Sequence, residues 1–234
     1  MTDFGHQDPF VGIMKGVILA AAPTASIVDL CHEVPVRDVR TAALFLRQSA
    51  PYFAAGTIFV CVVDPGVGSG RRILCARTKD HLFLAPDNGL LGWLSDAVLE
   101  WRVVENDEFF LKTVSATFHG RDIFAPVAAR LSAGLKPEAL GKTIGDPVLF
   151  AFPSEPVILA FDRFGNAVTS IMGEQRSIQY KGKVIPVGRT YADVKEGEAV
   201  AVKGSSGFIE LCVRNGSFAE QSSAKLGDTI EFRK

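Results

Sequence analysis

Asp64 and the residues after it are the first candidates for chemistry in this chain. The run Val60-Cys-Val-Val-Asp-Pro-Gly-Val-Gly-Ser-Gly-Arg-Arg72 predicts a buried strand, over residues 57–63, that ends at Asp64 and enters a glycine-rich loop. Open α/β sheets bind their ligands at the carboxyl ends of strands, so a carboxylate there is well placed. A plain turn, in which Asp64 caps its own backbone, is the alternative that this run favours when it is taken alone.

His119 is the second candidate. It lies in Thr117-Phe-His-Gly-Arg-Asp122, just before an apolar, helix-forming segment. Asp122 is a suitable N-cap, so His119 is expected directly before a helix N-terminus, where backbone N–H groups favour negative charge. Histidine is also the side chain that titrates nearest neutral pH. These features make His119 a possible partner for Asp64.

The composition limits the classes of function. The chain has 234 residues, 47% of them hydrophobic, and a formal net charge of −1. This is enough apolar material for a sizeable core, and it provides no positive field for nucleic acid or for an anionic membrane. No apolar stretch reaches membrane-spanning length, and no signal peptide is evident. The four cysteines lack Cys-x-x-Cys spacing, which favours reduced, buried thiols in a cytoplasmic protein.

The surrounding pattern predicts two domains. Residues 1–150 alternate helical and strand-like segments, including a short strand at 26–30, and Asp8 is a plausible N-cap for the first helix. This alternation predicts an α/β domain with a mostly parallel sheet. After three prolines (Pro147, Pro153 and Pro156), residues 151–234 read as short, evenly spaced strands with glycine-rich turns. We expect them to form a small antiparallel β-barrel.

Seven motifs, in order, resemble those of the S-adenosylmethionine (SAM) hydroxide adenosyltransferases, or SAM hydrolases, which are related to fluorinases and chlorinases. The motifs are Thr2-Asp-Phe-Gly, Asp8 with Met14-Lys-Gly16, Asp29-Leu-Cys-His-Glu-Val34, Val63-Asp-Pro-Gly-Val-Gly-Ser69, Pro86-Asp-Asn-Gly89, Thr117-Phe-His-Gly-Arg-Asp122 and Phe161-Asp-Arg-Phe-Gly-Asn166. No single motif is decisive, but together they cover nearly the whole chain. The resemblance implies the same two-domain architecture.

The resemblance also implies a reaction. Water or hydroxide would attack the 5′ carbon of SAM and release adenosine and L-methionine, with no metal or other cofactor. Orienting one water for such a displacement contributes about 7–11 kcal/mol in favourable cases. The residues that match the family's catalytic groups are Asp64, Arg71 and His119, with Arg72 as an alternative to Arg71. Asp64 could accept a proton from the water or only a hydrogen bond, and the neighbouring Arg71 favours the second role.

Substrate-binding residues follow from the same resemblance. Asp3 would hold the two ribose hydroxyls, and Asp8 and Asp162 would meet the methionine ammonium near Ser205. The adenine would lie against Phe164 and Tyr191, with its edge contacted by Asn166 and by the segment Arg214-Asn-Gly216. Simpler roles remain open for some of these residues: Asp8 as a helix cap, Phe164 as core, and Arg214 as a solvated strand end.

Two departures from the family pattern stand out. Arg37 occupies the place of an aromatic residue that borders the substrate in fluorinases. Family members also carry an apolar strand ahead of the Thr-Asp-Phe-Gly motif, whereas this sequence starts at Met1. Without such a strand, we expect a hydrophobic slot in the sheet and a loosely held Asp3.

Two other classes of function are considered. Asp3, His6, Asp8, His32 and Glu33 carry metal-binding groups, but their spacing is not a recognised ligand pattern. A SAM or nucleoside sensor without catalysis would keep the pocket and lose the catalytic groups. Candidate residues lie in both predicted domains, which is consistent with the homotrimer that the resemblance implies, with the pocket between the α/β domain of one subunit and the barrel of its neighbour.

Overall fold

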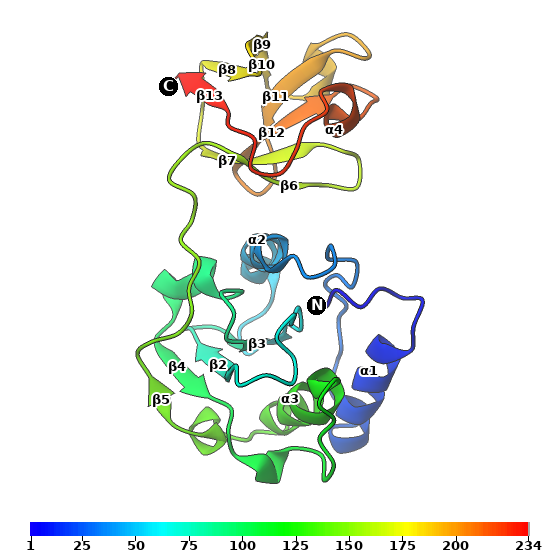
Figure 1. Ribbon diagram of the computed structural model, residues 1–234, viewed down its shortest axis with the longest axis vertical. Coiled ribbons are helices and arrows are strands. Elements are labelled where there is room, and N and C mark those ends of the chain that lie inside the picture. Colours follow the sequence, from blue (N-terminus) through cyan, green and yellow to red (C-terminus); the bar gives the residue numbers. More distant parts are fainter. Residues whose placement is uncertain (234) are drawn as a thin grey trace. The chain divides into compact units, whose positions relative to one another are not determined.

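The computed structural model describes residues 1–233 (Figure 1). The chain divides into two compact units, Met1–Ala151 and a second unit that begins at Phe152. The first unit contains the following elements: α1 (Phe10–Ala21), α2 (Val39–Ser49), β1 (Ile58–Val60), β2 (Ile73–Arg77), β3 (Leu82–Pro86), β4 (Glu100–Val103), α3 (Ala125–Ser132) and β5 (Thr143–Ile144). They form a five-stranded sheet in the order β1-β3-β2-β4-β5. Helices lie on both faces of this sheet (Figure 1).

The sheet of the first unit is mixed. β1 and β3 pair in parallel, whereas the ladders β3–β2, β2–β4 and β4–β5 are antiparallel. The prediction of a mostly parallel sheet is therefore not confirmed. The connection from β2 to β3 spans only residues 78–81, and parallel neighbours need a crossover of a dozen or more residues.

Both faces of β1 are covered, as its apolar sequence predicts. Phe59, Cys61 and Val63 belong to the core beneath α2, while Val60 and Val62 face the core formed with α1 and α3. Because side chains alternate along a strand, the next position on the α3 side after Val62 is residue 64. The strand therefore delivers Asp64 toward the face on which the segment before α3 lies.

Three local expectations need correction. Asp8 does not cap α1, whose N-cap is Pro9 with no side-chain hydrogen bond. Asp122 is not an N-cap either: it lies inside a π-helical turn, Gly120–Phe124, that leads directly into α3. Residues 26–30 belong to no ladder, because an apolar run favours extended backbone but a strand also needs a paired neighbour.

The described part of the second unit is mostly β, with one short α-helix and a 3-10 turn at Tyr191–Asp193. Its elements are β6 (Ile158–Phe161), β7 (Ala167–Met172), β8 (Ser177–Tyr180), β9 (Lys183–Ile185), β10 (Val187–Gly188), β11 (Ala199–Lys203), β12 (Phe208–Val213), α4 (Phe218–Gln221) and β13 (Glu231–Arg233). One sheet has the order β10-β11-β12-β7-β6 and the other β13-β8-β9. Neither sheet closes on itself, so a closed barrel is not confirmed.

Candidate active site

Asp64, Arg71 and His119 form one hydrogen-bonded cluster at the carboxyl end of β1. The Nε of Arg71 donates to both oxygens of Asp64, at 3.0 and 2.9 Å, and its Nη2 also donates to Asp64 Oδ2. The same Nη2 group lies 2.8 Å from His119 Nδ1. The side chains of Asp64 and Arg71 are only 4% and 11% exposed. A shielded carboxylate thus sits beside a neutralising guanidinium and an imidazole.

The protonation of His119 follows from this geometry. A guanidinium only donates hydrogen bonds, so Nδ1 of His119 must be the acceptor, and its ring proton lies on Nε2. The pKa of His119 is lowered from its ordinary value, mainly by burial and then by the charge of Arg71, while Asp64 opposes the shift. His119 is therefore neutral near pH 7, and its Nε2–H is the group left to contact a ligand.

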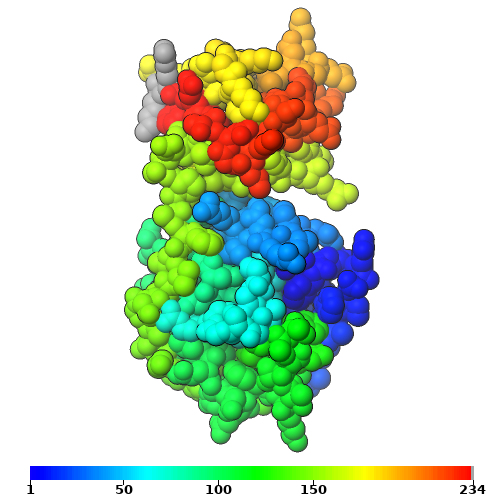
Figure 2. Space-filling model, in the orientation of Figure 1, coloured from blue at the N-terminus to red at the C-terminus, as the bar shows by residue number. Residues whose placement is uncertain are grey.

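The glycine-rich loop needs its glycine at position 68. Gly68 has a φ of +78°, and a Cβ there would lie 2.3 Å from the carbonyl oxygen of Ala116. The loop after β1 therefore packs directly on the segment before His119, as the adjoining cyan and green surfaces of Figure 2 show. This close approach brings the Asp64 loop and the His119 turn together.

Asn88 lies just after β3 and holds the segment that connects β1 to Asp64. Its Nδ2 donates to the carbonyl oxygen of Val63 at 2.9 Å, and its Oδ1 accepts from the N–H of Leu90 at 3.2 Å. The peptide that precedes Asp64 is thereby held in place. From the sequence, Pro86-Asp-Asn-Gly89 was identified only as one of the family-like motifs, and no role was assigned to Asn88.

Arg72 has different partners from Arg71. Its Nε donates to Asp87 Oδ2 at 2.6 Å, and its Nη1 donates to Asp146 Oδ1 at 2.8 Å. Asp87 also accepts from the N–H of Val148 at 2.7 Å. Arg72 thus ties β2 to the end of the first unit, and the arginine that contacts Asp64 is Arg71.

Asp3 leaves the sheet at the same edge as Asp64. Thr2 forms a parallel bridge with Val62, so the residues that follow each of them emerge side by side. Asp3 Oδ2 accepts from the N–H of Arg37 at 2.8 Å. Arg37 has a φ of +64° and contributes its backbone here. The expectation of a loosely held Asp3 is wrong.

Three phenylalanines connect the N-terminal segment to the His119 turn. The ring centroids of Phe4, Phe10 and Phe118 lie 5.2–6.0 Å apart in edge-to-face geometry. Phe4 follows Asp3 and Phe118 precedes His119, so this cluster brings both candidate residues to one side of the unit. Such aromatic contacts stabilise by about 0.5–1.5 kcal/mol each beyond their burial.

Asp8 is exposed, and the metal-binding alternative finds no ligand set. Both ring nitrogens of His32 are already engaged, Nδ1 with Thr2 and Nε2 with Asp29. Among residues 1–233, no group of three His, Cys, Asp or Glu side chains gathers as metal ligands would. Nothing in the described part of the chain therefore favours Asp3, His6, Asp8, His32 and Glu33 as a metal site.

In the second unit, Asp162 and Asn166 form one preorganised turn. Asp162 Oδ1 accepts from the N–H groups of Phe164 and Asn166, both at 2.9 Å, and Oδ2 accepts from Asn166 Nδ2 at 2.8 Å. The Phe164 side chain between them is 75% exposed. The suggestion that Phe164 belongs to the core is wrong, and an exposed aromatic beside a fixed carboxylate can contact a ligand.

A second turn of this unit carries Tyr191. Arg214 Nη1 donates to the carbonyls of Val194 and Ala192, at 2.8 and 3.3 Å, and thereby holds the turn from behind. Tyr191 is itself 45% exposed. Ser205 and Gly216 lie in exposed turns, at residues 204–207 and 214–216.

Glu210 was missed by sequence reasoning. Its carboxyl group packs against Gly204, where an added Cβ would lie 1.9 Å from Oε1. Its pKa is raised, mainly by burial and then by the charge of Asp162. In the sequence, a glutamate inside an otherwise apolar strand segment could have indicated a buried carboxyl group.

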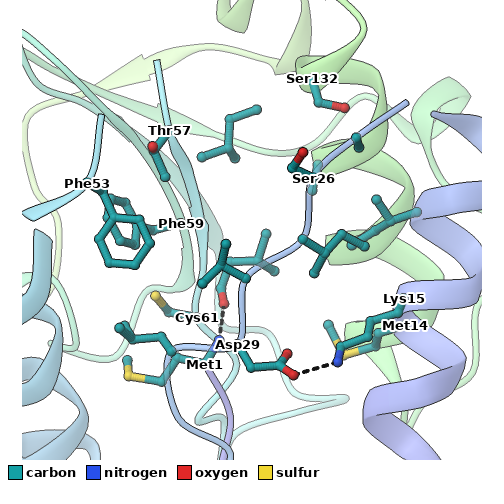
Figure 3. Close-up of a pocket in the computed structure, with 18 of the residues that line it drawn as sticks. Met1, Met14, Lys15, Ser26, Asp29, Phe53, Thr57, Phe59, Cys61 and Ser132 are labelled. Carbon is teal, nitrogen blue, oxygen red and sulfur yellow. Dashed lines mark hydrogen bonds and ion pairs between the residues drawn. The ribbon is translucent and has the colours of Figure 1, made fainter. Parts of the chain in front are cut away.

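A cavity of the first unit lies apart from the Asp64 cluster. It has a volume of about 610 Å³ and runs between β1 and the extended segment 26–30, and Asp64, Arg71 and His119 do not line it. Met1 and Thr2 close one end: the Met1 amino group donates to Val60 O at 2.8 Å, and Thr2 N donates to Cys31 O at 3.0 Å. Figure 3 shows Phe53, Phe59 and Cys61 on one side of this cavity. The expected hydrophobic slot is therefore present.

The arrangement defines a two-unit protein with a charged cluster at a strand end and aromatic and carboxylate groups in its β unit. The family model of the SAM hydroxide adenosyltransferase N-terminal domain matches residues 1–141, and that of the C-terminal domain matches residues 157–231. The chain belongs to the SAM hydroxide adenosyltransferase family.

Individual relatives agree with this assignment. The chain is 39% identical to an (R)-S-adenosyl-L-methionine hydrolase of Thermus thermophilus, covering 99% of this chain and 97% of the relative. A relative of the same name from Salinispora arenicola is 36% identical, over 98% and 94% of the two chains. A fluorinase of Nocardia brasiliensis is 26% identical, over 100% of this chain and 95% of the relative.

Solved structures show the same fold. A conserved protein of Thermotoga maritima superposes with a TM-score of 0.93 at 35% identity, covering 99% of this chain and 98% of that one. A conserved protein of Thermus thermophilus superposes with a TM-score of 0.85 at 36% identity, covering 99% and 97%.

Proposed function

We propose that this protein hydrolyses SAM to adenosine and L-methionine by attack of water on the 5′ carbon of the ribose. The observation that carries the proposal is the Asp64–Arg71–His119 cluster, in a chain whose relatives include (R)-S-adenosyl-L-methionine hydrolases. The carbon–sulfur bond breaks, the sulfonium leaves as a neutral thioether, and water supplies the new oxygen and releases one proton.

Asp64 and His119 have complementary roles toward that water. The carboxylate accepts a hydrogen bond and orients a lone pair toward the carbon, while the Nε2–H of neutral His119 fixes the oxygen. Arg71 holds both groups and is the ion-pair partner of Asp64. Because the leaving group departs without protonation, positioning the water is the main catalytic task.

The remaining candidate residues bind the substrate. Asp3 holds the ribose hydroxyls, and Asp8, Asp162 and Ser205 meet the methionine ammonium. Phe164 and Tyr191 border the adenine, whose edge is contacted by Asn166, Arg214 and Gly216. The exposure of Phe164 and Tyr191 and the fixed carboxylate of Asp162 support these roles.

Product analysis tests the proposal directly. Purified protein incubated with SAM in ¹⁸O-water, without added metal or nucleotide, should yield methionine and adenosine labelled at the 5′ oxygen. Formation of S-adenosylhomocysteine, or label elsewhere, would refute the displacement. Binding of SAM without product would identify a sensor instead.

We also infer a homotrimer in which neighbouring subunits share the substrate, as the family resemblance implies. Candidate residues from both units support a shared site. Mixing inactive Asp64→Ala and Asn166→Ala subunits should restore part of the activity in hybrid trimers. A fully active monomer at the assay concentration would contradict this inference.

A cytoplasmic location completes the proposal. All four cysteines are free thiols, which suits a reducing compartment. Among the described residues, no helix is long and apolar enough to cross a membrane.

A further inference from the structure

Four polar side chains of the first unit form a hydrogen-bonded relay that runs in the order Lys15, Asp29, His32 and Thr2. Lys15 Nζ donates to Asp29 Oδ2 at 2.6 Å, His32 Nε2 lies 3.0 Å from Asp29 Oδ1, and His32 Nδ1 lies 2.9 Å from Thr2 Oγ1. The Lys15–Asp29 pair is drawn in Figure 3. Thr2 and His32 are 1% and 7% exposed, so the inner half of this relay is buried.

One protonation state satisfies every member of the relay. If His32 carries its proton on Nε2, it donates to Asp29, and its Nδ1 accepts from the hydroxyl of Thr2. The Thr2 oxygen in turn accepts from the N–H of Phe4 at 3.2 Å. The opposite tautomer would direct a lone pair at the Asp29 carboxylate. The structure therefore favours neutral His32 with the proton on Nε2.

A Thr–His–Asp series can also suggest a nucleophile with its base. Here the Thr2 hydroxyl is 1% exposed, which leaves no room for a substrate carbon. Its hydrogen-bonding capacity is already used by His32 and the Phe4 N–H. The relay is therefore suited to holding a segment in place.

The segment that it holds contains Asp3. Thr2 N donates to Cys31 O at 3.0 Å, and Gly5 N donates to His32 O at 2.8 Å, so backbone bonds anchor the chain on either side of Asp3. Gly5 has a φ of +67°, and the resulting turn keeps its N–H directed at His32. His32 thus contributes both its carbonyl and its ring to the position of Asp3.

We propose that neutral His32 is a positioning residue for Asp3, acting through Thr2, and that protonation of His32 weakens substrate binding while leaving the chemical step unchanged. The proposal rests on the proposed function, in which Asp3 holds the ribose. Protonated Nδ1 becomes a donor, so the buried Thr2 hydroxyl loses its acceptor and the turn that carries Asp3 loosens.

The charges around His32 set the direction of its titration. Burial lowers the pKa of His32, and the Met1 ammonium and His6 add to this, while Asp29 opposes it. The ring of His6 lies 5.3 Å from that of His32. Lys15 in turn lowers the pKa of Asp29 and keeps it ionised as the acceptor for Nε2–H. His32 is therefore neutral at neutral pH and gains its proton only on acidification.

Two substitutions separate the contacts of the ring. In His32→Asn, the amide oxygen occupies the place of Nδ1 and accepts from Thr2, but it cannot titrate. In His32→Gln, the amide reaches the place of Nε2 and Asp29, and the bond to Thr2 is lost. We expect KM for SAM to stay low and independent of pH in His32→Asn, and to rise about fivefold at every pH in His32→Gln. kcat should stay within about twofold in both.

In the wild-type protein, KM should rise as the pH falls below the ordinary histidine pKa of about 6.5. Protonation of His32 should not change kcat. His6→Asn is the matched control and should keep the wild-type KM profile. A fall of kcat with unchanged KM in His32→Gln, or an acid rise of KM that persists in His32→Asn, would overturn the positioning role.

A readout that needs no activity separates this inference from the proposed function. In ¹⁵N spectra at neutral pH, the ring signal that disappears in His32→Asn should show a protonated Nε2 and an unprotonated Nδ1. A protonated Nδ1 would overturn the inference whatever the protein does to SAM. Absence of adenosine with the expected tautomer would instead overturn the proposed function.

Discussion

The carboxyl end of β1 and the cavity beside the strand differ in how closely the surrounding groups contact one another. At the carboxyl end, Asp64 has a fork of bonds from Arg71, and Asn88 holds the preceding carbonyl. Along the strand toward its amino end lies a cavity of about 610 Å³, whose lining includes residues 56–61. The Met1 ammonium is buried at its border, where it donates to Val60 O, and burial lowers its pKa.

This difference separates function from stability along one strand. The carboxyl end is rigid because Asp64, Arg71 and the neutral imidazole of His119 bond one another and Asn88 holds the preceding peptide, which suits the orientation of a water molecule. The amino end leaves apolar walls without packing partners, which costs stability and does not touch the cluster. Changes at the first end should therefore affect turnover, and changes at the second should affect unfolding.

Substitution of Asp64 should have the largest effect. Asp64→Asn keeps the shape of the side chain but removes the charge that orients the water, so we expect kcat to fall about 10²–10³-fold with a small change in KM. Steady-state formation of adenosine measures both constants. Near-normal turnover in Asp64→Asn would remove the cluster from the mechanism.

Asp146 provides a matched control for Asp64. It is also paired with an arginine, Arg72, but its side chain is 79% exposed. Asp146→Asn should change kcat by less than about twofold, because exposed ion pairs contribute little. A loss comparable to that of Asp64→Asn would show that arginine pairing in general, and not the Asp64 site, determines activity.

Filling the slot should have the next largest effect, on stability. A five-residue segment with apolar residues at alternating positions, fused ahead of Met1, can run beside β1. The fusion also replaces the buried ammonium by a peptide bond. We expect about 1–2 kcal/mol of added stability, as for other cavity-filling changes. Thermal unfolding should then shift upward by roughly 2–8 °C.

An extension of equal length made of glycine and serine is the control, because it has no apolar side chains to pack against Phe53 and Phe59. Equal unfolding temperatures for the two fusions would show that the slot does not accept a strand. A large change in kcat with the apolar fusion would contradict the separation of the two ends.

The sequence predicted the residues of the Asp64 cluster better than the residues that hold the surrounding segments in place. Asp64, Arg71 and His119 lie in local motifs whose residue types indicate chemistry, and the structure brings these three side chains together. Asn88 and His32 act on segments 25 and 30 residues away, on Val63 and Thr2, and no local spacing encodes such contacts. The catalytic roles themselves remain predictions.

The fold shows the same limit. The apolar run before Asp64 correctly indicated a strand buried on both faces, although β1 covers only Ile58–Val60 of the expected residues 57–63. The run at 26–30 also contains three apolar residues, yet its backbone has no ladder, because pairing depends on a neighbour that local sequence does not specify. Asp8 satisfied the local capping rule, but α1 begins one residue too late for its side chain to cap it.

Asn88→Ala should lower kcat less than Asp64→Asn does. It removes the amide that holds the Val63 carbonyl, so Asp64 should move relative to the water, and we expect kcat to fall about five- to tenfold. Asn106→Ala is the control, since Asn106 Nδ2 makes the same kind of bond to Ala139 O at 3.1 Å, away from the cluster. Equal kinetic effects of the two substitutions would refute a specific role for Asn88.

The smallest expected effect is the pH dependence of stability at the cluster. Burial and Arg71 lower the pKa of His119 in the folded protein, so below the ordinary histidine value of about 6.5 the unfolded chain binds a proton that the folded protein resists. Stability is therefore present above that value and decreases as the pH falls toward the folded pKa. Urea unfolding at about pH 7.5 and about pH 5.5 measures the decrease.

His32 and the Met1 ammonium have lowered pKa values as well, so the His119 contribution must be isolated. His119→Asn keeps an acceptor for Arg71 and removes the titration. The stability lost between the two pH values should accordingly be smaller in His119→Asn than in the wild-type protein. An equal loss in both proteins would mean that acid acts through Met1 and His32 and not through His119.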